Sequence, residues 1–356
     1  MIISRTPFRI SFFGGGTDYP AWYNENGGAV LATTFDKYCY ITLRYLPPFF
    51  DHNYRIIYSK MEHVNTLDDI NHPSVRETLR FMDMPQGVEI HHDGDLPART
   101  GLGSSSAFTV GLLNSLYALK GLRVTKERLV NEAIHIEQAM IGESVGCQDQ
   151  ALAGFGGFNY IEFGGNNHLR VRKITIPGEK LGSLQNHLML FFTGFTRFAS
   201  EIAQHQIKNI PNKTKELTAM QQLTEEAMRV LTDCDVTEFG KLLHESWLLK
   251  RSLSDKITTP VVDEIYSSAM NAGAIGGKLL GAGGGGFVLL FVEPDKQPAV
   301  RAKLAQFLEI PFKFEDQGSQ IIFYQPDSGV VHKTTAPMFG QSPNLKGDPR
   351  WERSNA

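Results

Sequence analysis

A glycine- and serine-rich segment that runs directly into a helix-forming stretch constrains this chain more than any other feature. Residues 96–107 read LPARTGLGSSSA, and the apolar residues of Ser104–Lys120 recur at every fourth position up to Gly121. That spacing predicts a helix with its start in the glycine segment. Glycines let successive N–H groups and a helix N-terminus point at one anion, and serine hydroxyls donate to phosphate or bind Mg²⁺. The segment therefore predicts a phosphate-binding loop, with a simple helix cap as the alternative.

Two further glycine-rich segments lie near the two ends of the chain. Residues 281–286 (GAGGGG) satisfy the letters of the dinucleotide fingerprint GxGxxG, but the apolar run 287–292 after them is typical of a buried strand, not a helix. A hairpin or a close approach to a ligand fits better, and a plain turn is the alternative.

In residues 9–19 (RISFFGGGTDY) a predicted strand ends in three glycines before Thr17 and Asp18. This segment suits either a loop that binds sugar hydroxyls or an ordinary turn.

Two carboxylates are candidates for metal binding and proton transfer. At 100° per residue, Glu137 falls inside the apolar stripe of a predicted helix over 126–141, so its charge points into the protein. A buried charge must meet a metal, a cation or backbone donors, and a structural ion pair is the alternative. Asp149 follows a loop at the predicted start of another helix, where it is alternatively a cap. With a phosphate loop, the two carboxylates suit Mg²⁺-assisted phosphoryl transfer.

Composition excludes several other classes of protein. The 356 residues are enough for about two domains, and a net charge of −3 argues against a domain that neutralises many nucleic-acid phosphates. The longest apolar runs are strand-sized, and the N-terminus does not resemble a secretory signal, so no membrane partner and a cytoplasmic location are expected. Cys39, Cys147 and Cys234 form no CxxC pair and are expected to be free thiols, and the histidines do not form a metal set.

Helix-like and strand-like patterns alternate along the chain, which predicts a mixed α+β class. Strands are expected at 29–46, 87–93, 187–192, 286–292, 310–315 and 320–325, and helices at 126–141, about 197–252, 261–272 and 295–308. We place a boundary between two domains near residue 185, giving units 1–185 and 186–325. Residues 326–356 combine Pro, Gly and polar residues without periodicity, which predicts an irregular tail.

The three glycine motifs resemble those of the GHMP kinase family, named for galactokinase, homoserine kinase, mevalonate kinase and phosphomevalonate kinase. They occur in the family's order at 7–19, 97–107 and 277–286. The resemblance implies a two-domain α+β fold, with a ribosomal S5-like N-terminal domain and a ferredoxin-like C-terminal domain. Segments such as TGFTRFAS (193–200) and GGKLLGAGGGGF (276–287) are most similar to the branch that phosphorylates the anomeric hydroxyl of D-glycero-D-manno-heptose 7-phosphate, on the way to nucleotide-activated heptoses.

Site roles follow from the resemblance, position by position. The phosphates of ATP would bind Gly101, Leu102, Gly103, Ser104, Ser105 and Ser106. Ser105 and Glu137 would hold Mg²⁺, Asp149 would be the catalytic base, and Arg9 would orient Asp149 and stabilise developing charge. The sugar would contact Gly15, Gly16, Thr17, Asp18, Gly283, Gly284 and Gly285.

One departure bears on the substrate. Galactokinases carry Glu-His where this chain has Gly15-Gly16, which argues against galactose and leaves room for a longer, phosphorylated sugar. Arg197 is the candidate cation for the far phosphate. The expected partner is thus a small phosphorylated sugar. The resemblance is also compatible with a homodimer of this chain. The alternatives are an anomeric kinase of fucose, a uronic acid or another hexose, and a non-catalytic nucleotide- or sugar-binding sensor.

Overall fold

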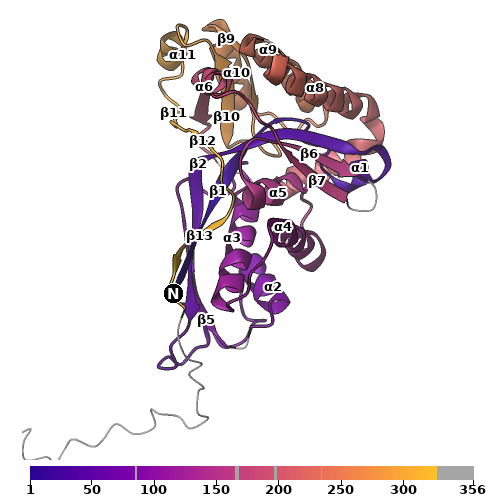
Figure 1. Ribbon diagram of the computed structural model, residues 1–356. Helices are drawn as coiled ribbons and strands as arrows, with labels where there is room; N and C mark the ends of the chain where they lie inside the picture. The colour runs from indigo at the N-terminus through magenta and orange to yellow at the C-terminus, as the bar shows by residue number, and fades with distance from the viewer. Residues whose placement is uncertain (85, 165–167, 196–198, 234, 327–356) are drawn as a thin grey trace, which may run out of the picture.

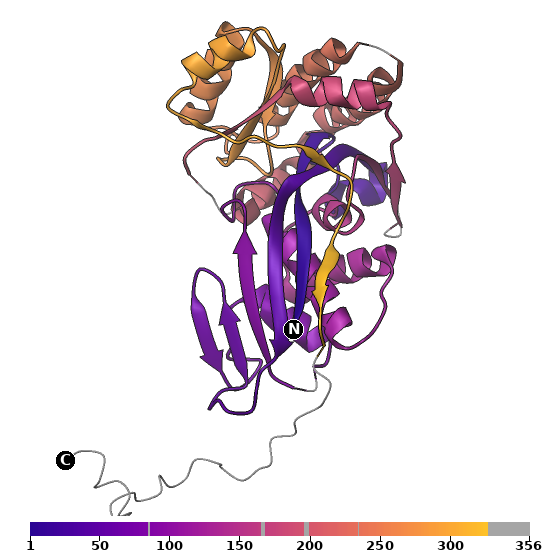
Figure 2. The same cartoon turned by 60° about the vertical axis from the view of Figure 1, so that its left-hand side comes forward.

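The computed structural model describes residues 1–84, 86–164, 168–195, 199–233 and 235–326, and arranges them in two units, each built on one sheet (Figure 1). The larger sheet has the order β13-β1-β2-β5-β3-β4, and in addition β12 and β6 pair with β2 and β7 pairs with β6. Figure 2 shows β13, in yellow, at the opposite edge from β3 and β4. The strands are β1 (Ile2–Phe13), β2 (Gly28–Tyr45), β3 (Tyr54–Ile57), β4 (Met61–Val64), β5 (Val88–Gly94), β6 (Asn159–Gly164), β7 (His168–Lys173), β12 (Phe314–Glu315) and β13 (Gln320–Tyr324).

Helices cover one face of this sheet. The predicted helix after the glycine segment is α3, which packs directly on β1 and β2, while α2, α4 and α5 pack around it (Figure 1). Because α3 is enclosed on all sides, nearly all of its residues are buried, and its apolar residues are spread around the helix. The helices of this unit are α1 (Pro20–Asn26), α2 (Pro73–Phe81), α3 (Ser104–Leu119), α4 (Lys126–His135), the π-helix η1 (Ile136–Ile141) and α5 (Gln148–Phe155).

The second unit has a four-stranded sheet in the order β11-β8-β10-β9. Its central strand β10 is buried at every position, which confirms the buried strand expected after the third glycine segment. The strands are β8 (Leu188–Phe192), β9 (Ala274–Leu279), β10 (Phe287–Val292) and β11 (Leu308–Glu309). The helices are α6 (Gly178–Asn186), α7 (Ala199–Asn209), the 3-10 helix η3 (Ile210–Asn212), α8 (Thr214–Asp233), α9 (Val236–Ser252), α10 (Pro260–Asn271) and α11 (Gln297–Lys303).

Several elements differ from the predicted ones for local reasons. The expected helix 197–252 is divided into α7, α8 and α9, because Pro211 lies in η3 and Asp235 caps a new helix by accepting from the N–H of Thr237. The helix expected to run to Ile141 changes to π-helical hydrogen bonding at Ile136. The strand expected at 310–315 is reduced to two residues in β12.

The last strands return to the first sheet. β12 pairs with β2, and β13 pairs antiparallel with β1, with Ile3 opposite Phe323. The boundary near residue 185 stays a prediction. The predicted division assigned residues 314–324 to the second unit, but their strands β12 and β13 belong to the sheet of the N-terminal unit. Such pairing joins strands about 300 residues apart, and no local pattern encodes it. No helix among the described residues has the length and apolar character needed to cross a membrane.

The two units meet through buried contacts between β1, α9 and the loop after β9. The rings of Phe12 and Phe13 pack on Phe239 of α9, at centroid distances of 5.3 and 5.0 Å. Lys278 of β9 crosses to β1 and donates from Nζ to the carbonyl of Phe12 over 2.6 Å. The glycines of the third motif allow this approach, since a Cβ built on Gly286 would lie 2.1 Å from the carbonyl oxygen of Thr100.

Gly286→Ala tests this close approach. Gly286 has φ +110°, so an alanine there meets both backbone strain and a clash with Thr100, and we expect a loss of at least about 2 kcal/mol in the free energy of unfolding. Gly178→Ala is the matched control, because a Cβ at Gly178 meets nothing within 4 Å and should be neutral or slightly stabilising. Urea unfolding measures both variants, and equal stabilities would contradict the packing at the junction.

Candidate active site

The predicted phosphate loop lies at the N-terminus of α3. Gly101 and Gly103 are both left-handed, with φ of 77° and 76°, and Gly103 is the N-cap of the helix. In the first turn of α3 the N–H of Ala107 donates to the carbonyl of Gly103, and the N–H groups before it have no helical partner among the described residues. An α-helix of 16 residues therefore presents free donors and the positive end of its dipole at the predicted anion site.

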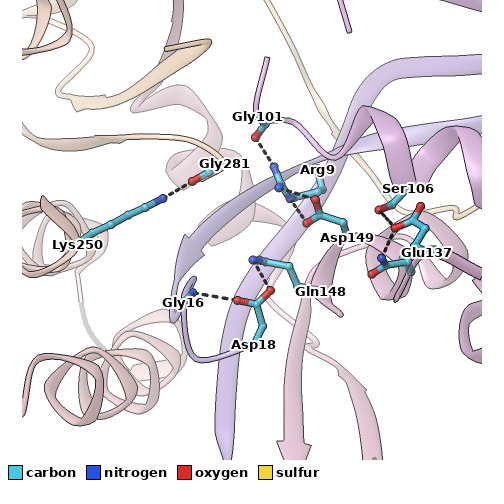
Figure 3. Close-up of polar contacts among 11 residues, drawn as sticks. Arg9, Gly16, Asp18, Gly101, Ser106, Glu137, Gln148, Asp149, Lys250 and Gly281 are labelled. Atoms are coloured by element: carbon cyan, nitrogen blue, oxygen red, sulfur yellow. Dashed lines mark hydrogen bonds and ion pairs between the residues drawn. The ribbon is translucent and has the colours of Figure 1, made fainter. Parts of the chain in front are cut away.

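Arg9 and Asp149 form an ion pair beside this loop (Figure 3). Arg9 donates from Nε to Oδ1 of Asp149 over 2.8 Å and from Nη2 to Oδ2 over 2.9 Å, and from Nη1 to the carbonyl of Gly101 over 2.5 Å. Its own backbone N–H donates to Leu102. The Arg9 side chain is 5% exposed and that of Asp149 is 26% exposed, so the arginine fixes a carboxylate that a substrate can still reach.

Asp18 lies next to this pair but has a different environment. Its Oδ1 accepts from the N–H of Gly16 and its Oδ2 from Nε2 of Gln148, each over 2.9 Å. The side chain is buried, and burial, with a smaller contribution from the charge of Asp149, raises the pKa of Asp18 above its ordinary value. Because Gln148 precedes Asp149 at the start of α5, one helical turn connects the predicted base with the predicted sugar-binding carboxylate.

Glu137 is buried, as predicted, but it has no counter-ion among the described residues. Its Oε2 accepts from Oγ of Ser106 over 2.8 Å and from Nε2 of Gln150, while Oε1 is buried without a hydrogen bond. Burial raises the pKa of Glu137 to about 7, although the nearby hydroxyls of Thr109 and Ser106 favour the charged form. A carboxylate without a counter-ion that contacts Ser106 of the predicted phosphate loop fits a cation better than the structural ion pair that was the alternative.

The donor set around Glu137 is compatible with Mg²⁺. Magnesium takes oxygen ligands and is commonly held by one or two carboxylates together with substrate phosphates, so the lack of a group of three His, Cys, Asp or Glu side chains among the described residues is no obstacle. The hydroxyl that contacts Glu137 belongs to Ser106, whereas Ser105, the predicted ligand, is exposed at the start of α3. The metal roles of Ser105 and Glu137 stay predictions.

Other predicted substrate residues have mainly structural contacts. The hydroxyl of Thr17 donates to the carbonyls of Gly14 and Ala29, which closes the first glycine loop. Gly283, Gly284 and Gly285 are buried against protein: a Cβ on Gly283 would meet the backbone of Ile257, and one on Gly285 the ring of Phe195. Their sugar contacts stay predictions, and Arg197 lies outside the described residues.

Gly15 and Gly16 are also buried, but a Cβ on either would make only ordinary van der Waals contacts. Gly15 lies near two polar atoms that sequence reasoning missed. A Cβ on Gly15 would have no neighbour closer than Oγ of Ser11, at 3.6 Å, and Nε2 of Gln148, at 3.8 Å. Oγ of Ser11 and Oε1 of Gln148 are buried without hydrogen-bond partners among the described residues. The alternation of β1 places Ser11 on the same face as Arg9, which is the signal that could have identified it.

Comparisons with known proteins agree with this arrangement. The model of the GHMP kinases N terminal domain matches residues 72–157, and that of the GHMP kinases C terminal domain matches residues 227–310. The D-glycero-alpha-D-manno-heptose 7-phosphate kinase of Campylobacter jejuni is 30% identical over 308 residues, which cover 83% of this chain and 91% of that protein. The bifunctional fucokinase/GDP-fucose pyrophosphorylase of Arabidopsis thaliana is 25% identical over 338 residues, but the match spans only 31% of its length.

Solved structures show the same fold. The crystal structure of a D-glycero-D-manno-heptose 1-phosphate kinase from Bacteroides thetaiotaomicron matches with a TM-score of 0.74 and 25% identity, over 90% of this chain and 98% of that one. The mevalonate kinase of Methanococcus jannaschii matches with a TM-score of 0.68 at 20% identity, over 88% of this chain and 98% of that one, which supports the fold alone. Together these findings confirm the resemblance and the fold class expected from the motifs. The chain belongs to the GHMP kinase family and is a sugar kinase, a phosphotransferase whose acceptor is an alcohol group and whose phosphate donor is ATP.

Proposed function

We propose that this enzyme transfers the γ-phosphoryl group of ATP to the anomeric hydroxyl of D-glycero-D-manno-heptose 7-phosphate and releases the 1,7-bisphosphate and ADP. The observation that carries the proposal is the pair of Arg9 and Asp149 held against Gly101 of the phosphate loop. This pair places the partly exposed carboxylate of Asp149, which can accept a proton, beside the N–H donors at the start of α3, which suit a triphosphate. The names of the relatives from Campylobacter jejuni and Bacteroides thetaiotaomicron support a heptose as the acceptor.

In this mechanism Asp149 accepts the proton of the anomeric hydroxyl. The oxygen of that hydroxyl forms a bond to the γ-phosphorus while the bond from this phosphorus to the β,γ-bridging oxygen breaks, and ADP leaves with the electron pair. Arg9 keeps both oxygens of Asp149 in a fixed orientation. The N–H groups at the start of α3 bind the phosphate oxygens, so positioning and electrostatic stabilisation supply most of the acceleration.

Glu137, with Ser105 or Ser106, would hold Mg²⁺ next to the nucleotide phosphates. When bound, Mg²⁺ neutralises charge on the transferring phosphoryl group. The buried Oε1 of Glu137, which accepts no hydrogen bond of normal geometry from the part of the chain that the structure describes, supports this assignment.

The sugar is placed by residues of the first motif and of α5. Asp18 is proposed to accept a hydrogen bond from one hydroxyl, and Ser11 and Gln148 offer buried polar atoms beside Gly15. The lack of side chains at Gly15 and Gly16 is compatible with a longer sugar than galactose, and Arg197 stays the proposed partner of its 7-phosphate.

The deciding experiment measures ADP release from ATP and Mg²⁺ with a panel of acceptors, and phosphorus NMR locates the new phosphate. The panel contains heptose 7-phosphate, heptose 1-phosphate, free heptose, fucose, mannose, galactose and mevalonate. It includes both heptose phosphates because the names of the two relatives differ in the position of the phosphate, and fucose because of the plant relative.

Strong turnover of heptose 7-phosphate with a new anomeric phosphate is the expected result. Turnover restricted to fucose or another hexose would replace the substrate and keep the mechanism. Tight ATP binding with no turnover of any acceptor would favour a sensor.

A further inference from the structure

A buried lysine from the second unit lies beside the site and has no part in the mechanism above. Lys250 of α9 is 4% exposed, and its Nζ donates to the carbonyl of Gly281, with a longer contact of 3.5 Å to the carbonyl of Leu279. No carboxylate among the described residues forms an ion pair with it. Burial of an ammonium group that contacts only neutral carbonyls lowers the stability of the folded chain. Such a cost suggests that Lys250 serves the function of the neighbouring site.

Lys250 donates to the carbonyl of Gly281, and Gly281 is a point at which the second unit contacts the first. Gly281 has φ +75°, and a Cβ built on it would lie 2.3 Å from Cα of Gly101. Gly101 is itself held through its carbonyl by Nη1 of Arg9. Each of the two touching glycines is therefore fixed by a cation from its own unit, as Figure 3 shows for Arg9 and Lys250 on either side of the junction.

These cations also fix the direction of two peptide groups. In a trans peptide the N–H of the following residue points opposite to the carbonyl. With the carbonyl of Gly101 turned to Arg9, the N–H of Leu102 faces away from Arg9, among the free donors of the phosphate loop. A shift of Gly281 would remove the surface against which Gly101 is packed and loosen this orientation.

The charges around Lys250 leave it without a carboxylate of its own. The charged groups that act on it are Arg9, Asp18 and Asp149, while burial and repulsion from Lys250 and Arg9 lower the pKa of the neighbouring Lys278 of β9 well below its ordinary value. One of these carboxylates, Asp149, is already paired with Arg9. Burial, followed by repulsion from Arg9, lowers the pKa of Lys250 to about 8. A polyphosphate bound beside Lys250 would favour its charged form.

We propose that Lys250 is a positioning residue for phosphoryl transfer, which holds Gly281 against the phosphate loop and supplies positive charge that the bound ATP requires. This inference rests on the proposed assignment of residues 101–106 to the phosphates of ATP. It does not depend on which sugar accepts the phosphoryl group.

The test is the affinity for ATP with Mg²⁺, measured by titration calorimetry from pH 7 to pH 9.5 in the full-length enzyme. The wild-type affinity should fall as the pH rises through about 8, because Lys250 loses its charge although the neutral amine still donates to Gly281. Lys250→Met should bind ATP at least about tenfold more weakly at pH 7 and show no such fall. Lys250→Arg, whose guanidinium stays charged, should recover much of the affinity without the fall.

Lys180→Met is the matched control, since Nζ of Lys180 also donates to a backbone carbonyl, that of Val230 over 3.0 Å, in a contact that touches none of the site residues. Its ATP affinity and pH dependence should equal those of the wild type.

Unchanged affinity in Lys250→Met would overturn the proposal. A fall in affinity above pH 8 that persists in Lys250→Met would also overturn it, because that fall would belong to Lys278 or another group. If Lys250→Met does not fold, the pH dependence of the wild type against Lys250→Arg decides. Because ATP binding needs no acceptor, failure of the acceptor panel leaves this test intact, and turnover of heptose 7-phosphate with failure here leaves the proposed function intact.

Discussion

Asp149→Asn is expected to lower kcat by roughly 10²–10⁴-fold while ATP binding stays close to that of the wild type. The amide cannot accept the proton of the anomeric hydroxyl, but it has nearly the same shape and can still accept one hydrogen bond from Arg9. Single-turnover kinetics with the best acceptor of the panel, together with calorimetric titration of ATP, separates the chemical step from binding.

Asp316→Asn is the matched control for this variant. Asp316 forms a surface ion pair with Lys173 over 2.7 Å and its side chain is 65% exposed, so its neutralisation should change stability by less than about 1 kcal/mol and leave kcat unchanged. Near-normal turnover of Asp149→Asn would exclude Asp149 as the base. Loss of ATP binding along with turnover would instead assign Asp149 to the integrity of the phosphate loop.

Glu137→Gln is expected to shift the Mg²⁺ activation curve to higher concentration and to lower kcat by about 10²–10³-fold at moderate Mg²⁺. The substitution removes the charge that would attract the cation and keeps the acceptor for Ser106. The measurement is the rate as a function of Mg²⁺ concentration at fixed, saturating ATP. An unchanged Mg²⁺ curve would return Glu137 to a structural role.

The stability of Glu137→Gln shows whether a change in its kinetics could come from misfolding. Burial raises the pKa of Glu137 in the folded state to about 7, above its value of 4.5 in an unfolded chain. Protonation is therefore favoured by folding, and this contribution to stability is complete below pH 4.5 and is lost as the pH rises through 7. In metal-free buffer at pH 8, Glu137→Gln should unfold at a temperature no lower than the wild type. Glu132→Gln, on the preceding helical turn and paired with Arg128, should leave the Mg²⁺ curve unchanged.

Much of the local structure could be predicted because it depends on neighbouring residues. The spacing of apolar residues after 104 predicted α3, and a continuous apolar run after the third glycine motif predicted β10 and excluded a dinucleotide fold. The helical periodicity also predicted the burial of Glu137, which is 1% exposed. The π-helical turn that carries Glu137 was not predicted, since an apolar stripe does not distinguish hydrogen bonds to the fourth residue from those to the fifth.

The sequence by itself determined in which order the glycine motifs occur, and it identified candidate residues for phosphoryl transfer. The glycine loops, Arg9, Glu137 and Asp149 were identified from local pattern and family resemblance, because backbone freedom, charge and helical phase are properties of short segments. Only the tertiary structure decided the partners: Ser106 and Gln150 on Glu137, Gln148 on Asp18, and Lys250 on Gly281. These contacts join residues from 13 to 130 positions apart. They depend on how helices and sheets pack, which is a collective property of the whole core and leaves no periodic signal in any one segment.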